Sequence, residues 1–480
     1  MTKILPEEFI QQTQKLMGEE MFAQLSDAIC HSEPPTSIRL NRFKAPQGTH
    51  LADNSSTDAE AEVKTHHESE KSEKAAASIV PWCPDYGRYL TERPNFTFDP
   101  LFHAGLYYAQ EASSMFVDLV VRQLIHEPVV MLDLCAAPGG KSTAVRNVLP
   151  DGSLLISNEP MRTRAQILAE NMQKFGHPDE IVTNNYAIDY PRSRLQFDMI
   201  LADVPCSGEG MFRKDEGAIR EWSVANVKKC AALQREIITD IMPCLRDGGL
   251  LVYSTCTYNR QEDEENVDFI CSEWQMEKLS ERHFIPGETR SEGLYMAALR
   301  QTGSDASQQT TISMLDSSAT KKDNKLKRRG KASAEQAVKG AKEMSGWIKG
   351  NEDFSITTLG QRFVAVRKQW RNVYDTALEK LRVMHAGIEL GEPKGKDIIP
   401  AEGLALSTAF NPEAFATAEL DRDTAIAYLR REPIQLPPDT PRGFVAVGYQ
   451  GLNLGFVKNL GNRTNNLFPQ EWRIRMQNDA

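Results

Sequence analysis

The sequence predicts a Rossmann-like, doubly wound α/β domain, and two observations carry this prediction. From Val129 to Tyr253, short and continuously apolar runs alternate with helix-like segments. Strands have continuously apolar sequences when helices cover both faces of a parallel sheet. The first apolar run also leads directly into a Gly-Gly turn, and such folds bind ligands beyond the carboxyl ends of their strands.

The elements of this domain follow one another at short intervals. The predicted strands are Val129–Ala137, Leu154–Glu159, Glu180–Asn185, Phe197–Pro205 and Leu250–Thr255. The predicted helices are KSTAVRNVL after the Gly-Gly turn, Arg162 to about Phe175, and about Asn226 to Leu245, which ends in Asp-Gly-Gly. The acidic start of EDEENVDFICSEW favours a further helix.

The regions on either side of this domain differ from it in composition. Four segments are predicted: an α+β extension over 1–125, the α/β domain over 126–300, a flexible basic linker over 301–345, and a C-terminal module over 346–480. Residues 46–78 are almost devoid of apolar side chains and are predicted to be a disordered insertion. TSIRLN (Thr36–Asn41) is a candidate strand, and short apolar runs from Gly443 predict a β-rich end.

Composition is that of a soluble globular chain. No stretch approaches the roughly 20 apolar residues that cross a bilayer, and the acidic N-terminus is unlike a signal peptide. A cytoplasmic protein without a membrane partner, monomeric by default, is therefore expected. The eight cysteines contain no C-x-x-C pair, which indicates neither a metal site nor a disulfide framework. Most of them are expected to be buried.

The net charge of −10 argues weakly against a nucleic-acid partner, but local basic patches matter more than net charge. Three such patches are candidates for RNA contact: the segment Lys321–Lys331, the pair Arg213 and Lys214, and the group Lys458, Arg463, Arg473 and Arg475.

Polar groups gather at the predicted strand ends. The turn Cys135, Ala136, Ala137, Pro138, Gly139, Gly140 and Lys141 follows the first strand. Its end, Gly140-Lys141-Ser142, resembles a Walker A loop, but that motif requires glycine where Cys135 stands. The turn instead suits a carboxylate bound at a helix N-terminus. With Glu159 at the next strand end as acceptor for a ribose, the pattern fits a nucleoside cofactor without pyrophosphate, such as S-adenosylmethionine.

Two cysteines, in DVPCSGEG (Asp203–Gly210) and YSTCTYN (Tyr253–Asn259), follow buried strands in polar surroundings. Carbon 5 of cytosine attacks a methyl group only after a nucleophile has added to carbon 6, and a thiolate suits this role. A base must then remove the carbon 5 proton. Asp203, if protonated, is placed to stabilise the adduct at the ring nitrogen. The residues alone do not rank Cys206 against Cys256.

These motifs resemble the Sun/nucleolar-protein family of RNA cytosine-5 methyltransferases, in its RsmF-type ribosomal RNA branch. The resemblance runs from about Ser37 to Arg300 and includes TSIRLN, AGLYYAQEASSM, LDLCAAPGGKS, DVPCSGEGMFRKD, STCTYN and EGLYMAALR. It implies that residues 135–141, Glu159 and Asp203 bind S-adenosylmethionine. It further implies that Cys256 is the nucleophile and that Cys206 assists proton removal and product release.

One position departs from the family pattern. Members usually carry an acidic residue near the adenine just after the third strand, whereas Tyr186 stands there. Either the ring of Tyr186 stacks on the adenine or Asp189 reaches in. The C-terminal GLNLGFVKNLGNRTNNLFPQEWRIR resembles a small PUA-like RNA-binding domain, in which Phe456, Phe468 and Trp472 either stack on bases or form the core.

The resemblance implies RNA as partner, most plausibly ribosomal RNA or the small ribosomal subunit, with the target cytosine unstacked or flipped. Three alternatives remain at this stage. The catalytic motifs are compatible with transfer RNA as substrate. A P-loop nucleotidase would use Gly140-Lys141-Ser142 with Asp203, and a non-catalytic RNA-binding assembly protein would keep only the fold.

Overall fold

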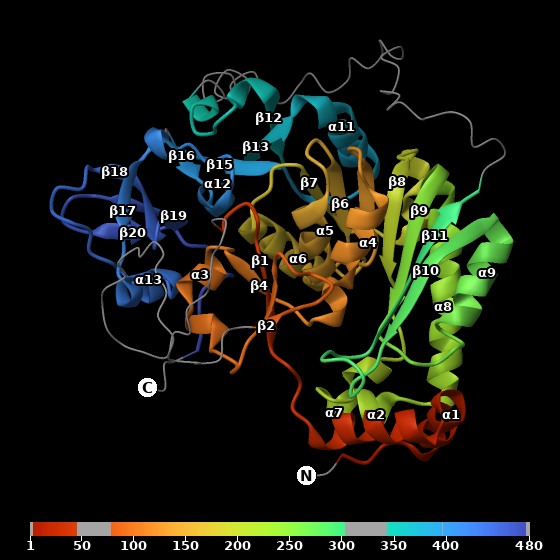
Figure 1. Cartoon of the computed structure of the whole chain (residues 1–480). Coiled ribbons are helices and arrows are strands. Elements are labelled where there is room, and N and C mark those ends of the chain that lie inside the picture. Colours follow the sequence, from red (N-terminus) through yellow and green to blue (C-terminus); the bar gives the residue numbers. More distant parts are fainter. Residues whose placement is uncertain (1–2, 46–77, 303–342, 396, 477–480) are drawn as a thin grey trace, which may run out of the picture.

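An eight-stranded sheet in the order β10-β11-β9-β8-β5-β6-β7-β14 forms the centre of the molecule (Figure 1). The computed structural model describes residues 3–45, 78–302, 343–395 and 397–476. Residues 46–77 of the predicted insertion and the cations Lys321–Lys331 therefore lie outside the described residues, and its last residue, Ser78, begins a short strand. The sheet consists of β5 (Val130–Asp133), β6 (Leu154–Asn158), β7 (Glu180–Thr183), β8 (Phe197–Asp203), β9 (Leu245–Thr255), β10 (Met276–Phe284), β11 (Leu294–Gln301) and β14 (Val383–Ala386).

The five predicted strands, β5 to β9, are parallel to one another, which confirms the predicted core of the sheet. Three further strands are antiparallel and were not predicted: β11 pairs with β9, β10 with β11, and β14 with β7. β10 is a half-exposed edge strand with the polar sequence MEKLSERHF, so it shows no apolar run. β14 comes from the C-terminal part of the chain, beyond the predicted linker.

Helices cover both faces of this sheet, as predicted. One apolar layer joins the strands to α4 (Phe116–Leu124), α5 (Gly140–Val148) and α6 (Arg162–Phe175). The other joins them to α8 (Val224–Ile241), α9 (Glu264–Trp274) and α11 (Arg371–Lys380). The prediction that α8 extends to Leu245 is wrong. A 3-10 turn at Met242–Cys244 ends it, and Asp247-Gly248-Gly249 lies within β9, where Gly248 has a φ of 74°.

The N-terminal extension has two parts. Helices α1 (Glu7–Met17) and α2 (Glu19–His31) pack with α7 (Glu216–Glu221) around Phe9, Phe212 and Trp222, below the end of α8 (Figure 1). A four-stranded antiparallel sheet follows, with β1 (Ser37–Leu40) in the predicted TSIRLN segment. Its other elements are β2 (Ser78–Ile79), β3 (Gly87–Tyr89) and β4 (Tyr107–Ala109), with α3 (Pro100–His103) before β4.

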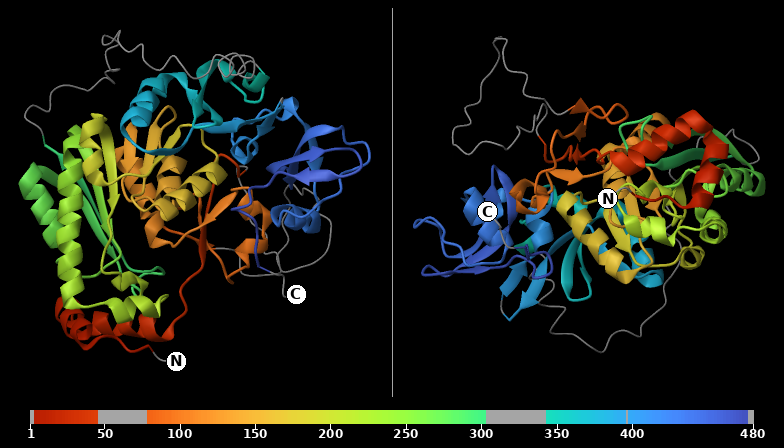
Figure 2. Two further views of the ribbon diagram at one scale, coloured as in Figure 1. Left: turned by 180° about the vertical axis from the view of Figure 1, so that it is seen from behind. Right: turned by 90° about the horizontal axis from the view of Figure 1, so that it is seen from below.

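Two smaller sheets make up most of the C-terminal region, on the opposite flank from α8 and α9 (Figures 1 and 2). The first contains β12 (Phe354–Leu359), β13 (Arg362–Arg367), β15 (Ile388–Lys394) and β16 (Asp397–Pro400), followed by α12 (Glu402–Leu406). The second contains β17 (Ala416–Glu419), β18 (Gly443–Tyr449), β19 (Leu452–Asn459) and β20 (Thr464–Asn466), together with α13 (Arg422–Leu429). The predicted β-rich end from Gly443 is confirmed. Phe456 and Phe468 are buried there in two different apolar clusters, and Trp472 packs against the cluster that contains Phe468.

Among the described residues, none of the helices has both the length and the apolar character that a membrane span requires.

Candidate active site

The candidate site lies where the strand order of the central sheet reverses. Chain order runs outward from β5 through β6 and β7 on one side, and through β8 and β9 on the other. Diverging connections leave a crevice at the carboxyl ends of β5 and β8. A cavity of about 250 Å³ opens there. Its lining comes from the turn after β5 (Cys135, Ala136, Ala137, Pro138, Gly140, Lys141), from Asp133 and Asp203 at the strand ends, and from the β4 side (Tyr108, Ala109, Gln110, Glu111, Ser114).

The local sequence explains why the turn after β5 opens onto this cavity. Gly139 has a φ of 112°, a left-handed conformation that favours glycine, and it caps the N-terminus of α5. The Ala136 N–H donates to the Asn158 carbonyl at 2.8 Å, which holds the turn against the end of β6. Gly139 itself is not among the lining residues, so its contribution is to shape the turn.

Asp133 lines the cavity, although it was not predicted as a site residue because it lies inside the apolar run Val129–Ala137. Its side chain is fully buried, and its Oδ2 accepts a hydrogen bond from Ser142 at 2.6 Å. Its Oδ1 has no hydrogen-bond partner among the described residues. Burial raises the pKa of Asp133 to about 7. An unpaired carboxyl oxygen on a residue that lines a cavity suits a ligand with a cationic or hydrogen-donating group.

Glu159 follows β6 as predicted but does not line the cavity. It is buried, accepts the Met161 N–H at 2.9 Å, and lies 3.6 Å from the guanidinium of Arg164. Arg164 also donates to the Ala137 carbonyl at 2.8 Å. This arginine therefore links the end of β6 to the cavity turn, and a ribose reaching Glu159 would have to displace it.

Tyr186 and Asp189 lie after β7 and also fall outside the cavity lining. The side chain of Tyr186 is 69% exposed, and its N–H donates to Asp189 Oδ2 at 3.1 Å. Asp189 further pairs with Arg192 at 2.8 Å. Tyr186 is thus free to cover a ligand, whereas Asp189 already has two partners.

Asp203, at the end of β8, borders the cavity and also contacts the neighbouring strand. Its Oδ2 lies 2.9 Å from Lys141 Nζ, and its Oδ1 accepts from Ser254 Oγ at 2.6 Å. Lys141, the cation that would contact phosphates in a Walker A loop, is therefore engaged by this carboxylate. The ammonium of Lys141 also lies within electrostatic reach of Cys256.

The two predicted cysteines meet beyond β8 and β9. Cys206 Sγ and Cys256 Sγ are 2.8 Å apart, and the Cys256 N–H donates to Cys206 Sγ at 3.3 Å. The hydrogen bond to Cys256 and burial raise the pKa of Cys206 well above its ordinary value. Either sulfur can be the donor in the contact between the two thiols, and Cys206 holds its proton more tightly than an ordinary thiol does. The expectation that most cysteines are buried is wrong, because only Cys83 and Cys244 of the eight are buried.

Arg213, predicted as part of a basic patch, is unavailable for an RNA phosphate. It is buried and pairs with Glu292 at 3.0 Å, and Lys214 lies 3.6 Å from the same carboxylate. In the C-terminal group, Lys458 pairs with Asp397 at 2.7 Å.

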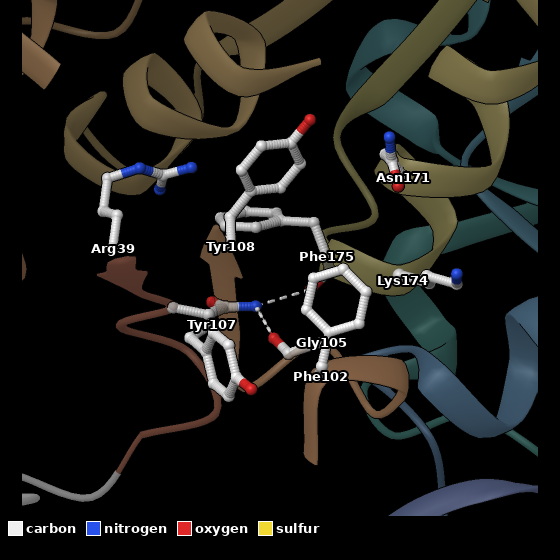
Figure 3. A pocket seen from close by; sticks show the side chains of 9 residues that line it. Arg39, Phe102, Gly105, Tyr107, Tyr108, Asn171, Lys174 and Phe175 are labelled. Atoms are coloured by element: carbon white, nitrogen blue, oxygen red, sulfur yellow. Dashed lines mark hydrogen bonds between the residues drawn. The ribbon is translucent and has the colours of Figure 1, made fainter. Parts of the chain in front are cut away.

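A second hollow, of about 20 Å³, adjoins the cavity at Tyr108. Figure 3 shows the rings of Tyr108 and Phe102 near that of Phe175 of α6, and the Asn41 amide donates to the carbonyls of Gly105 and Phe175 at 3.0 and 2.9 Å. This volume holds no more than one water molecule. The hollow is therefore part of the packing between the N-terminal sheet and α6.

A pH dependence of stability follows from Asp133. Its pKa is about 7 in the folded chain and 3.8 ordinarily, so between these values the folded state binds more protons than the unfolded state. Asp133 therefore destabilises the fold increasingly as pH rises through this window, by up to about 1.4 kcal/mol per pH unit. Asp133→Asn keeps an acceptor for Ser142 and should become progressively more stable than wild type from pH 4 to 8. Urea unfolding at each pH measures this, and a constant difference would contradict it.

The chain resembles known proteins over most of its length. Three family models match it: 16S rRNA methyltransferase RsmB/F over residues 124–300, the methyltransferase RsmF PUA domain over 415–474, and the N-terminal domain of 16S rRNA methyltransferase RsmF over 58–112.

Individual relatives agree with these matches. A ribosomal RNA small subunit methyltransferase F from Cronobacter sakazakii is 30% identical, with 82% of this chain and 84% of the relative covered. The protein of the same name from Enterobacter sp. is 28% identical over 97% of this chain and 95% of its own length. Among solved structures, a methyltransferase homolog from Pyrococcus horikoshii superimposes with a TM-score of 0.50 and 21% identity, over 62% of this chain and 95% of that one. The last likeness concerns the fold alone.

Proposed function

Since this chain belongs to the 16S rRNA methyltransferase RsmB/F family, we propose that it forms 5-methylcytosine in small-subunit ribosomal RNA. The observation that carries this proposal is the pair of thiols, 2.8 Å apart, at the ends of adjacent strands. Asp203 lines the cavity and accepts a hydrogen bond from Ser254, two residues before Cys256, whereas the two cysteines lie outside the cavity lining. A nucleophile, a second thiol and an acid thus lie at the ends of adjacent strands beside a ligand cavity, which suits covalent catalysis on a pyrimidine.

S-adenosylmethionine is the cofactor, and the cavity residues fit it. It is a cation with an amino group, and Asp133 offers a buried carboxyl oxygen without a partner. Residues 135–141 would hold it at the N-terminus of α5, with Glu159, Tyr186 and Asp189 as further candidates at neighbouring strand ends. When bound, S-adenosylmethionine supplies the electrophilic methyl group.

The chain's own groups then act in sequence on the cytosine. The Cys256 thiolate, hydrogen-bonded by the Cys206 thiol, adds to carbon 6, and Asp203, after exchanging its ion pair with Lys141 for a proton, donates that proton to ring nitrogen 3. This addition makes carbon 5 nucleophilic, so that it takes the methyl group. The hydrogen bond and the negative charge that raise the pKa of Cys206 disappear once the Cys256 sulfur is bound to carbon. Cys206 then loses its proton to solvent and removes the carbon 5 proton. Cys256 leaves as thiolate, and the proton on ring nitrogen 3 returns to the Asp203 carboxylate.

The family assignment favours ribosomal over transfer RNA as substrate and leaves no support for a nucleotidase. A non-catalytic role is also disfavoured, because two juxtaposed thiols have no evident use in an RNA-binding scaffold.

The hollow at the C-terminal end offers a place to hold RNA. It has a volume of about 350 Å³ and is lined by Arg431, Pro433, Thr464, Asn465, Asn466, Gln470 and Arg473. Within the described residues, its lining includes two guanidinium groups and no carboxylate. Guanidinium and amide donors suit RNA phosphates.

Arg431→Ala with Arg473→Ala should therefore weaken RNA binding about tenfold, and the slope of log affinity against log salt should decrease by about 2, one for each lost phosphate contact. Filter binding at several KCl concentrations measures both quantities. The control is Arg371→Ala on α11, whose guanidinium is already paired with Asp375 at 2.9 Å. An unchanged salt slope in the double variant would place the phosphate contacts elsewhere.

The proposed function is tested by transferring labelled methyl from S-adenosylmethionine to purified 16S RNA, small ribosomal subunits and transfer RNA, followed by nucleoside analysis. Label in 5-methylcytidine of ribosomal RNA or subunits is expected, and the better substrate identifies the assembly stage. Label in another nucleoside would refute the cytosine-5 assignment, and label in transfer RNA alone would refute the ribosomal one.

A further inference from the structure

The two cysteine-bearing loops approach each other closely. Cys206 belongs to the loop after β8, and Cys256 to the loop after β9. The Gly210 N–H of the first loop donates to the Cys256 carbonyl at 2.8 Å. A Cβ at Gly210 would lie 3.0 Å from that carbonyl and 2.6 Å from the Gly293 carbonyl, so only glycine fits this approach.

A buried glutamate from the second loop reaches across to the first. Glu262 Oε2 accepts the N–H of Ser207, the residue after Cys206, at 3.0 Å. The same oxygen accepts from Gln234 Nε2 of α8 at 2.7 Å. Glu262 thereby fixes the backbone that carries Cys206.

A second buried glutamate makes the reverse connection. Glu209, on the first loop, accepts the N–H of Tyr258, two residues after Cys256, at 2.7 Å with Oε2. Its Oε1 accepts from Trp222 Nε1 at 3.0 Å. Each loop thus holds the other by a carboxylate placed a few residues from its own cysteine.

Asn259 joins the two carboxylates. Its amide nitrogen donates to Glu209 Oε1 at 3.1 Å and to Glu262 Oε1 at 2.9 Å. Its own oxygen accepts from the Glu262 N–H at 3.0 Å, which fixes the orientation of the amide.

Stability alone does not explain this arrangement. Both glutamates are fully buried, and each lies near the other's charge. Burial raises the pKa of Glu209 to about 7. A buried pair of like charges costs free energy that apolar side chains of similar size would not. All the partners described above donate hydrogen bonds, so both glutamates act here as acceptors.

We propose that Glu209 and Glu262 are positioning residues, which hold the sulfur atoms of Cys206 and Cys256 at the separation that the reaction needs. Neither glutamate touches the substrate in this account. The catalytic consequence rests on the proposed function, whereas the geometric consequence is testable without RNA or cofactor.

Glutamine cannot replace either glutamate without loss. In Glu209→Gln the new NH2 faces either the Tyr258 backbone N–H or the Trp222 indole N–H, and neither donor can reverse. In Glu262→Gln it faces either the Ser207 N–H or the Asn259 amide. Asn259 cannot reverse because its oxygen is already used. Each substitution preserves volume and inserts one donor–donor contact between the loops.

Diamide oxidation of the full chain provides the geometric test. Two thiols lose their protons and two electrons to diamide, forming one disulfide and reduced diamide (a hydrazine). The rate of Cys206–Cys256 disulfide formation, followed by mass spectrometry of the linked peptides, reports how well the sulfurs are aligned. We expect Glu209→Gln and Glu262→Gln to slow it about tenfold or more, since small misplacements of reacting groups have large kinetic effects.

The matched control is Glu402→Gln, a buried glutamate on α12 that is hydrogen-bonded by Tyr428. This control should leave the disulfide rate unchanged. Equal rates of disulfide formation in wild type, Glu209→Gln and Glu262→Gln would overturn the proposal. Should a glutamine variant fail to fold by circular dichroism, Asn259→Ala removes the shared donor and the acceptor of the Glu262 N–H but leaves both carboxylates, and should slow the reaction by a smaller factor.

Two further measurements separate positioning from general destabilisation. In single-turnover methylation, Glu209→Gln and Glu262→Gln should each have a lower rate constant than wild type and an unchanged affinity for RNA. The pH midpoint for alkylation of Cys206 by iodoacetamide should fall in Glu262→Gln, because a neighbouring negative charge is removed. Unchanged methylation rates would overturn the catalytic consequence. If wild type methylates no cytosine, the proposed function fails, while the diamide result still decides the geometry.

Discussion

Replacing Cys256 by alanine is expected to reduce methyl transfer to RNA by at least about 1,000-fold, the order of effect seen when an enzyme loses its nucleophile. Without a thiolate at carbon 6, carbon 5 of cytosine is too weak a nucleophile to take a methyl group. RNA affinity should remain close to wild type, because Cys256 contributes chemistry and not binding. Single-turnover transfer of labelled methyl, with RNA binding measured in parallel, checks both expectations.

Cys271→Ala is the matched control, since Cys271 is also a partly exposed thiol but lies on α9, away from the strand ends. It should retain full activity. A Cys256→Ala protein with more than a tenth of wild-type activity would assign the nucleophile to another residue, and Cys206 would be examined next.

Replacing Cys206 by alanine is expected to have a different and equally large effect. Cys256 can still add to carbon 6 and the methyl group can still be taken up, but no base is left to remove the carbon 5 proton. The protein should therefore remain bound to RNA through Cys256, and turnover should stop after one event. A band of protein crosslinked to RNA that survives denaturing electrophoresis would show this.

The crosslink should require S-adenosylmethionine and should vanish in the double variant Cys206→Ala with Cys256→Ala. Normal turnover by Cys206→Ala, without any crosslink, would remove Cys206 from the mechanism and leave another base to be found.

Much of the central domain could be predicted because its signals are local. An apolar run followed by a glycine turn shows β5 and the start of α5, and the buried strands β6 to β9 are equally continuous. The edge strands of the sheet could not be predicted, because β10 is polar and β14 lies just over 200 residues beyond its partner β7 in the chain. Neither a half-exposed strand nor a distant pairing leaves a periodic signal in the sequence.

In the candidate site, too, the residues marked by a local signal could be predicted and the others could not. The cysteines, Asp203 and the turn at 135–141 stand out because each follows a buried strand. Asp133 was hidden inside an apolar run, although a lone carboxylate in a buried strand is a signal that could have been used. The crossed contacts of Glu209 and Glu262 join residues about 50 positions apart, and nothing local marks them. The assignment of Cys256, and not Cys206, as the nucleophile came from the family resemblance and not from the chemistry of the residues.

The central claim, a covalent bond between Cys256 and carbon 6 of cytosine, is tested most directly with RNA containing 5-fluorocytidine. Fluorine takes the place of the proton that the base removes, so the methylated adduct should accumulate on the wild-type enzyme. Digestion with trypsin and nuclease, followed by mass spectrometry, should find the methylated fluoronucleotide on the Cys256 peptide. An adduct on Cys206, or no adduct under conditions that yield 5-methylcytidine in ordinary RNA, would contradict the account.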